Sequence, residues 1–164
     1  MDTFTRGKRS EIMRRVKSID TKPELLVRSL LHRLGFRFRI HSKDLPGKPD
    51  IVLAKYKTII FVHGCFWHQH SRCKEADLPA SRRDYWVSKF EKNIKRDRTN
   101  TRRLRMLGWK VVLVWECETK NSIKLAKRLV KEIIGGSVGY DSSYAIGVLA
   151  AEKKGEYRRG LKGS

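Results

Sequence analysis

The chain has 164 residues, of which 40% are hydrophobic, and 38 Lys and Arg against 17 Asp and Glu leave a formal net charge of +21. This length is enough for one domain with a buried core, and two domains are not expected. So large a positive excess favours a polyanionic partner, and we expect nucleic acid rather than a membrane surface. No apolar run approaches the roughly 20 residues of a membrane span, and positions 1–8 lack a signal-peptide core.

Basic and polar residues dominate positions 1–19, which we interpret as an N-terminal arm. One short amphipathic helix is predicted within it from the spacing of Ile12, Met13, Val16 and Ile19. Thr21 and Glu24 form a capping-box pattern, and the leucines that follow predict a helix that stops at Gly35. The alternation of apolar and basic residues over 36–41 then predicts a half-buried strand.

Further along the chain, two apolar runs predict strands at 51–54 and 58–62, joined by a turn at 55–57. Residues 84–108 predict a long helix with a Lys/Arg face opposite an apolar side formed by Trp86, Phe90, Ile94, Leu104 and Leu107. The chain continues with a predicted strand at 110–115, a predicted helix at 122–134 and an apolar run at 144–151. It ends in a basic tail at 152–164 that we expect to be disordered. This order predicts an α/β domain over 20–151, with a small mixed β-sheet flanked by helices.

Metal-ligating residues are concentrated between positions 61 and 73. Cys65, His70 and Cys73 follow the pattern C-x4-H-x2-C, a spacing from which one zinc ion can collect three ligands. Cys117, the remaining cysteine, follows an apolar run and is the candidate fourth ligand. An odd number of cysteines argues against a disulfide framework, although buried thiols acting as small hydrophobes remain an alternative.

Two histidines near this cluster are free for other chemistry. Asp50 stands at the entry of one predicted strand, and the next strand leads into His63, with His68 shortly after. A carboxylate beside two imidazoles can bind a hard cation and activate a water molecule. Asp50 could instead cap a turn, and His63 could be a hydrogen-bonded histidine at a strand end.

Five segments carry a resemblance to a known family: Leu45–Asp50, Phe61–His68, Asn93–Arg98, Leu107–Val111 and Val114–Cys117. From about Thr5 to Gly135 the chain resembles the very short patch repair (Vsr) DNA mismatch endonucleases. The resemblance implies a restriction-endonuclease-like core. It also implies nicking of one strand 5′ to the thymine of a T:G mismatch, the product of 5-methylcytosine deamination.

The resemblance also implies roles for single residues. Asp50 and the backbone carbonyl of Val62, where another family member has threonine, are expected to bind catalytic Mg²⁺. His68 is expected to activate the attacking water, with His63 as a second active-site histidine. Glu24 is expected to support the site, although its place in the capping box explains it equally well. Structural zinc is expected on Cys65, His70, Cys73 and Cys117. The spacing between His68 and Cys73 differs by one residue from that in a version of this segment that contains more histidines.

DNA contacts are expected from aromatic and basic residues. By resemblance, Phe66, Trp67 and Trp86 wedge into the duplex beside the mismatch, and Met13 enters from the opposite groove; core packing is the alternative for the aromatics. Phosphate contacts are expected from the basic face of the 84–108 helix, including Lys92, Lys95 and Arg96. The expected partner is double-stranded DNA with a T:G mismatch.

We further expect a cytoplasmic, nucleoid-associated monomer, with mismatch-repair proteins as candidate partners. A relaxed-specificity nickase and a non-catalytic zinc-containing DNA-binding module are the alternative functions.

Overall fold

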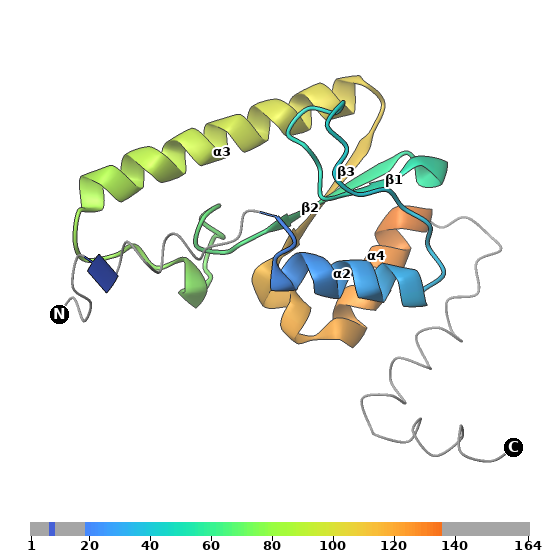
Figure 1. The fold of residues 1–164 in the computed structure, drawn as a ribbon, viewed down its shortest axis with the longest axis horizontal. Coiled ribbons are helices and arrows are strands. Elements are labelled where there is room, and N and C mark those ends of the chain that lie inside the picture. Colours follow the sequence, from blue (N-terminus) through green and yellow to red (C-terminus); the bar gives the residue numbers. More distant parts are fainter. Residues whose placement is uncertain (1–6, 9–18, 136–164) are drawn as a thin grey trace, which may run out of the picture.

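A three-stranded mixed β-sheet lies at the centre of the protein (Figure 1). In this computed structural model, which describes residues 7–8 and 19–135, β1 (Ile51–Leu53) pairs antiparallel with β2 (Thr58–His63), and β2 pairs parallel with β3 (Lys110–Trp115). The predicted small mixed α/β fold is therefore confirmed. Several predictions fall outside the described residues: the helix in the arm with Met13, except for its last residue Ile19, and the apolar run at 144–151 with the basic tail.

The helix α2 (Lys22–Arg33) begins after the predicted N-cap Thr21, but the capping box is only half formed, because the Glu24 carboxylate bonds the backbone of Asp20 instead of that of Thr21. The Thr21 side chain accepts a hydrogen bond from the Glu24 backbone N–H at 3.4 Å, and the Glu24 carboxylate accepts one from the Asp20 backbone N–H at 3.0 Å. Gly35, with a φ of 80°, follows the helix as predicted. The cap thus fixes the Glu24 side chain at the start of α2, where it is only 5% exposed.

The strand predicted over 36–41 is wrong. Only one residue of this segment pairs with the sheet: Arg39 bridges Val52 through two backbone hydrogen bonds of 2.9 Å. His41 has a φ of 55°, in the left-handed region, so the chain turns away from β1 instead of extending along it. The alternation that suggested a strand reflects Phe36 entering the core while Ile40 stays 41% exposed.

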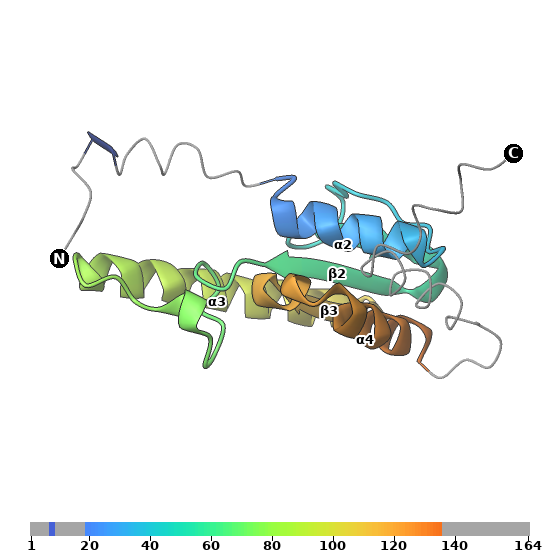
Figure 2. The ribbon, with the colours of Figure 1, turned by 90° about the horizontal axis from the view of Figure 1, so that it is seen from below.

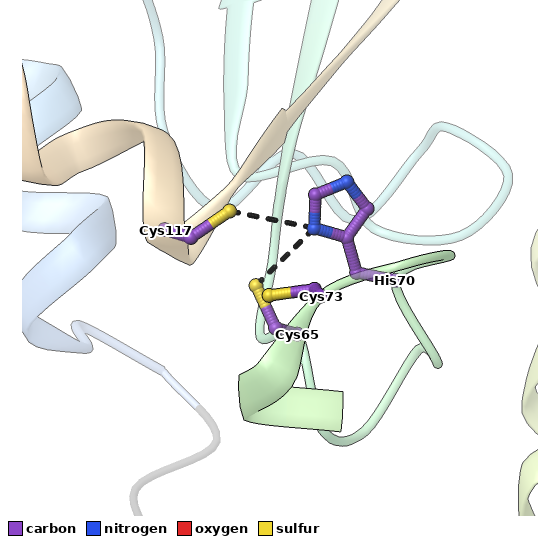
Figure 3. A group of neighbouring side chains, drawn as sticks. All are labelled: Cys65, His70, Cys73 and Cys117. Carbon is purple, nitrogen blue, oxygen red and sulfur yellow. Dashed lines mark hydrogen bonds between the residues drawn. The ribbon is translucent and has the colours of Figure 1, made fainter. Parts of the chain in front are cut away.

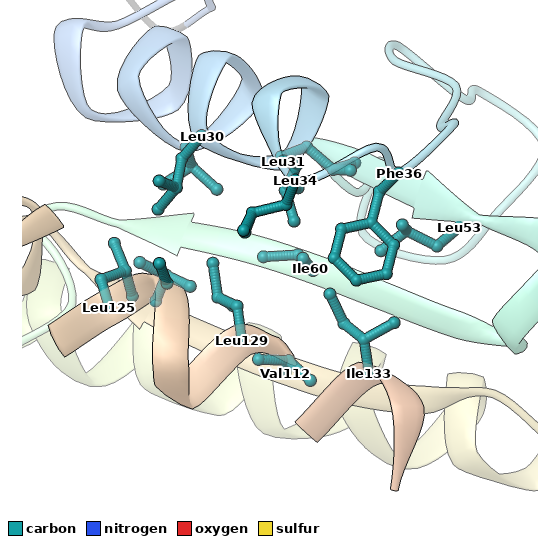
Figure 4. Close-up of a cluster of buried hydrophobic side chains, with 14 of the residues drawn as sticks. Leu30, Leu31, Leu34, Phe36, Leu53, Ile60, Val112, Leu125, Leu129 and Ile133 are labelled. Atoms are coloured by element: carbon teal, nitrogen blue, oxygen red, sulfur yellow. The ribbon is translucent and has the colours of Figure 1, made fainter. Parts of the chain in front are cut away.

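The two faces of the sheet carry different helices (Figure 1), and Figure 2 views the molecule from below. On one face, α2 and α4 (Ser122–Ile134) pack their aliphatic side chains against Ile60, Val62 and Val112, as Figure 4 shows for part of this core. On the other face, Ile59 and Phe61 contact Leu104 of α3 (Arg83–Met106). Because successive residues of a strand point to opposite faces, His63 follows Ile59 and Phe61 toward the α3 face.

Helix α3 is longer than the sheet it covers, and its N-terminal half lies beside the loop that follows β2 (Figure 1). The predicted apolar side is correct at Phe90 and Leu104, which are 4% and 0% exposed, but wrong at Leu107. Leu107 is 57% exposed because the helix ends at Met106 and the chain turns into β3. The helix therefore spans both the core and the loop that carries the metal-ligating residues.

Short 3₁₀ helices complete the described chain: η1 (Ala54–Tyr56) in the β1–β2 connection, η2 (Lys74–Ala76) and η3 (Glu116–Lys120). The predicted turn at 55–57 thus takes a helical form, and Lys57 closes it with a φ of 48°. Among the described residues, no helix is both long and apolar enough to cross a membrane.

Candidate nuclease and metal sites

The four predicted zinc ligands converge on one point (Figure 3). Cys65, His70 and Cys73 come from the loop after β2, and Cys117 lies in η3 after β3. The parallel pairing of β2 and β3 ends at His63 and Trp115, so both segments leave the sheet at the same edge. A segment far along the chain therefore meets the C-x4-H-x2-C loop.

The arrangement of these side chains fits a tetrahedral zinc ion. The His70 Nδ1 atom lies 3.6 Å from Cys65 Sγ and 3.4 Å from Cys117 Sγ. Zinc bonds of the usual length at tetrahedral angles would separate a nitrogen and a sulfur ligand by about 3.6 Å. Burial, followed by the neighbouring thiols, raises the pKa of Cys65 to about 12. Such a thiol stays protonated at neutral pH unless a cation stabilises its thiolate.

Asp50 lies just before β1 and contacts the adjacent strand. Its Oδ2 accepts a hydrogen bond of 2.7 Å from the Val62 backbone N–H, which places two predicted magnesium-site residues side by side. Burial raises the pKa of Asp50 from 3.8 to about 6, although this hydrogen bond lowers it. The charge of Glu24 raises the pKa further, while Arg28 and His68 lower it. The predicted catalytic residues Glu24 and His68 are thus both close enough to Asp50 to influence its pKa.

His63 and His68 form a stacked pair. Their ring centroids lie 3.8 Å apart with an angle of 11° between the planes. The Nδ1 atom of His68 lies 2.5 Å from Oδ2 of Asp97, a residue in the middle of α3. An ionised carboxylate accepts hydrogen bonds and cannot donate them. Asp97 therefore selects the His68 tautomer that carries hydrogen on Nδ1, which leaves Nε2 free to act as a base.

The two histidines have different electrostatic environments. Burial, together with the neighbouring His68, lowers the pKa of His63 to about 4, so His63 is neutral at physiological pH. Burial alone would raise the pKa of Asp97, but the hydrogen bond and charge of His68 lower it overall. Asp97 is therefore ionised beside His68 and can stabilise a proton that His68 accepts.

Among the described residues, two groups of side chains have potential ligand atoms within 4.8 Å of one another. One is the zinc cluster, and the other consists of His63, His68 and Asp97. Asp50 belongs to neither group. Mg²⁺ commonly binds one or two carboxylates and completes its octahedron with water and substrate phosphate, so an isolated carboxylate is compatible with that ion.

Glu24 has a structural environment of its own. Its carboxylate accepts hydrogen bonds from the Thr21 hydroxyl at 2.9 Å and from Arg28 at 3.1 Å. Arg28 is only 11% exposed and also pairs with Asp20. The cap role of Glu24 is therefore present, and the same side chain contributes to the field at Asp50.

The aromatic residues predicted to enter DNA form one cluster. Phe66 lies between the rings of Trp67, Trp86 and Phe90, at centroid distances of 5.1, 5.2 and 5.1 Å. Phe90 is buried, whereas the other three rings are partly exposed. Asn93 fixes the loop to α3 by donating a hydrogen bond to the Trp67 carbonyl at 3.1 Å. The cluster has both a buried base and an accessible edge.

Lys92, Lys95 and Arg96 lie on α3, beside the turn that carries Asp97, and all three are exposed. Arg98, Arg102, Arg103 and Arg105 extend the exposed basic surface toward the end of the helix. A positive surface of this kind attracts a phosphate backbone.

Sequence reasoning missed Asp97. The residue lies 29 positions from His68 and is surrounded by basic residues, so spacing alone offers no link between the two. A signal was present nevertheless, because Asp97 is an isolated acid within a run of Lys and Arg and belongs to the segment Asn93–Arg98.

Comparisons with known proteins show which family this chain is similar to. A family model described as DNA mismatch endonuclease Vsr matches residues 1–75. The type II nicking enzyme V.NmeAIP of Neisseria meningitidis is 50% identical over 135 residues, 80% of this chain and 96% of its own. V.XorIIP of Xanthomonas oryzae, also named a type II nicking enzyme, is 48% identical over 78% of this chain and 93% of its own. DNA mismatch endonuclease Vsr of Escherichia coli is 41% identical over 80% of this chain and 83% of its own.

Proposed function

The chain belongs to the Vsr family of DNA mismatch endonucleases, and we propose that it nicks one DNA strand 5′ to the thymine of a T:G mismatch. The observation that carries the proposal is the His68–Asp97 pair, held at 2.5 Å and electrostatically coupled to Asp50. A base oriented by a carboxylate, beside a second carboxylate that can bind a cation, is suited to hydrolysis of a phosphodiester.

Asp50 and the backbone carbonyl of Val62 would hold Mg²⁺. When bound, the ion would polarise the scissile phosphate and lower the pKa of a coordinated water. The raised pKa of Asp50 supports this assignment, because a buried carboxylate with a single hydrogen bond gains from a cation beside it. Glu24 adds negative charge to the same region and thereby favours cation binding.

His68 takes the proton from the attacking water at Nε2, while Asp97 holds Nδ1–H and stabilises the resulting imidazolium. His63 stays neutral at physiological pH because of its low pKa. It would therefore act at the phosphate as a hydrogen-bond donor rather than as a cation. This division follows from environment, since the two rings are chemically identical and differ in burial and partners.

Mismatch selection is assigned to the aromatic cluster of Phe66, Trp67 and Trp86, with Met13 of the N-terminal arm on the opposite side. Inserting rings between base pairs costs a few kcal/mol of lost stacking, and a mismatched step costs less to open. The partly exposed edges of the cluster and its attachment to α3 through Asn93 support this assignment. The core alternative accounts for Phe90 better than for the other rings.

The basic face of α3, including Lys92, Lys95 and Arg96, would position the phosphate backbone. We further propose a monomer that acts on bacterial DNA in the cytoplasm, at the nucleoid, with the four-residue zinc site as a structural element. Mismatch-repair proteins remain candidate partners.

One alternative keeps the same chemistry with a broader choice of duplex. Two of the most similar relatives are named nicking enzymes rather than mismatch endonucleases, and these names support a nickase with a broader choice of duplex as the alternative. Family membership argues against the third alternative, a zinc-containing DNA-binding module without catalysis.

The test is magnesium-dependent nicking of a labelled duplex with one T:G pair, compared with matched T:A and C:G duplexes. Asp50→Ala serves as the inactive variant, and Asp44→Ala, which removes an exposed carboxylate from the preceding loop, serves as the control. A single Asp50-dependent nick 5′ to the mismatched thymine supports the proposal. Equal cutting of all three duplexes supports the broader nickase, and binding without cleavage contradicts both.

A further inference from the structure

A continuous path of four rings connects the candidate zinc site to the candidate catalytic base. His68 stacks on His63 at 3.8 Å, and His63 meets the edge of Trp115 at 5.5 Å and an angle of 75°. Trp115 in turn stacks on His70, a predicted zinc ligand, with centroids 4.2 Å apart and planes 8° from parallel. Trp115 thus contacts a residue of each site.

The backbone holds Trp115 in this position. His63 and Trp115 are partners in the parallel ladder of β2 and β3, so their side chains leave the sheet on the same face. The Trp115 backbone N–H donates to Glu118 Oε2 at 2.8 Å, and Arg128 of α4 donates to the same oxygen at 3.0 Å. The tryptophan backbone is therefore held by the strand ladder and by Glu118, without any bond to the ring of either histidine.

We propose that Trp115 is a positioning residue that transmits the order of the zinc site to the His63–His68 pair. With His70 bound in the zinc cluster, the Trp115 ring has a fixed surface on one side. Its edge then limits the movement of His63, and the stacked His63 keeps His68 aligned with Asp97. Zinc would thus support catalysis through a chain of ring contacts. This inference rests on the proposed nicking function in one respect: the rate measurement that tests it requires a nicking enzyme.

The test compares three variants, each loaded with one zinc ion per chain. Trp115→Leu retains apolar volume but removes the flat ring, and Trp115→Phe retains a ring that can stack on His70. Trp109→Leu is the matched control, because Trp109 immediately precedes the same strand but packs against the other end of the core and Lys57. Single-turnover nicking and duplex affinity are measured separately, so that chemistry and binding are distinguished.

Trp115→Leu is expected to slow single-turnover nicking about 10- to 100-fold with little change in duplex affinity, because misplacement of a catalytic group costs a factor of this order. Trp115→Phe is expected to recover most of the rate, and Trp109→Leu to keep it. A Trp115→Leu rate equal to that of Trp109→Leu would overturn the proposal.

A second readout does not need a nicking assay. The Nδ1 proton that His68 donates to the Asp97 carboxylate lies in a charge-assisted hydrogen bond, and downfield proton NMR can follow it. Its signal should disappear in Trp115→Leu and in zinc-stripped protein, and persist in Trp115→Phe. A persistent signal in Trp115→Leu contradicts the positioning role even if the wild type nicks no duplex tested. Absence of nicking together with the expected signals would contradict the proposed function alone.

Discussion

The contact between His68 and Asp97 joins the loop after β2 to the middle of α3, and it defines which nitrogen of His68 can act as a base. Replacing Asp97 by Asn keeps the size of the side chain but removes its charge, so the imidazolium formed during catalysis loses its partner. Since general-base catalysis contributes about 10²–10⁴-fold, we expect a loss of nicking rate within that range.

Single-turnover kinetics on the T:G duplex would measure this effect, with Glu91→Gln as the control. Glu91 is an exposed acid of the same helix, so its replacement changes the net charge by the same amount. Equal rates for the two variants would show that Asp97 is not needed to orient His68.

Asp50 illustrates a conflict between stability and function. Its pKa is raised from 3.8 to about 6, so the folded state binds a proton more tightly than the unfolded chain. The protonated carboxyl favours folding below the unfolded pKa, and this contribution disappears as the pH rises through about 6. Asp50→Asn should therefore abolish nicking yet stabilise the magnesium-free protein at pH 8, by about 1–3 kcal/mol.

Urea unfolding at pH 8 and pH 4 tests this prediction, because the advantage of Asn should vanish at the lower pH. Asp44→Asn, in the exposed part of the preceding loop, controls for the change in net charge. An Asp50→Asn protein that is less stable than the wild type at pH 8 would indicate that the ionised carboxylate is well solvated or paired.

At the scale of elements, the loop between β2 and α3 contains the short 3₁₀ helix η2, but no α-helix and no strand. Its position relative to η3 is therefore expected to depend on zinc. Cys73→Ser should reduce bound zinc below one ion per chain and lower the free energy of unfolding by several kcal/mol, since metal binding to a structural site is coupled to folding.

Metal analysis and thermal unfolding would follow both effects, and Ser71→Ala, an exposed change in the same loop, should alter neither. Full zinc content and an unchanged melting temperature in Cys73→Ser would remove Cys73 from the ligand set.

Helix α3 combines a buried contact with the sheet and an exposed basic face, so its charges can be changed without disturbing the core. The double variant Lys92→Ala, Lys95→Ala should weaken binding to every duplex. It should also reduce the slope of log affinity against log salt by about 2, because each lysine that neutralises a phosphate adds roughly one to that slope.

Titrations over a range of salt concentrations measure that slope. The control is Lys127→Ala, Lys131→Ala, which removes two exposed lysines from α4, on the opposite face of the sheet. Equal slopes for the two double variants would place the DNA elsewhere than along α3.

Across the molecule as a whole, the proposed mismatch selection would require the loop after β2, α3 and the His63–His68 pair to act on one deformed duplex. Trp67 packs on Phe66 and approaches Trp86 at 5.9 Å, and Lys89 lies 5.7 Å from its ring. Trp67→Ala should lower the T:G rate more than the binding of matched DNA, because ring insertion contributes only where a base step opens.

The ratio of nicking rates on T:G and T:A duplexes measures the effect, and Trp109→Leu should keep the wild-type ratio. A Trp67→Ala protein with unchanged discrimination would favour the core role that the aromatic pair could also fill.

Local signals sufficed for much of the fold. Thr21 and Glu24 cap a helix through bonds within four residues, Gly35 terminates it, and the apolar runs of β1, β2 and β3 are bounded by turn residues. The exception at 36–41 arose because the pairing of a strand depends on a partner and on the backbone of His41, neither of which alternation reveals.

For the candidate site, spacing was sufficient where the residues are close in sequence. Cys65, His70 and Cys73 could be grouped from the sequence alone, and Cys117 could be added because the chain has no other cysteine. Asp97 and Trp115 could not be assigned, because a carboxylate on a basic helix and a tryptophan at a strand end have many ordinary explanations.

Most helices and strands, and the chemical identity of the candidate ligands, could thus be read from the chain alone, because they follow from short-range periodicity and residue type. The tertiary structure was needed to show that α3 brings Asp97 to His68, and that the β2–β3 register sets Trp115 between His63 and His70. Those contacts depend on long-range packing, in which the partner of a side chain is set by how the elements are arranged in space.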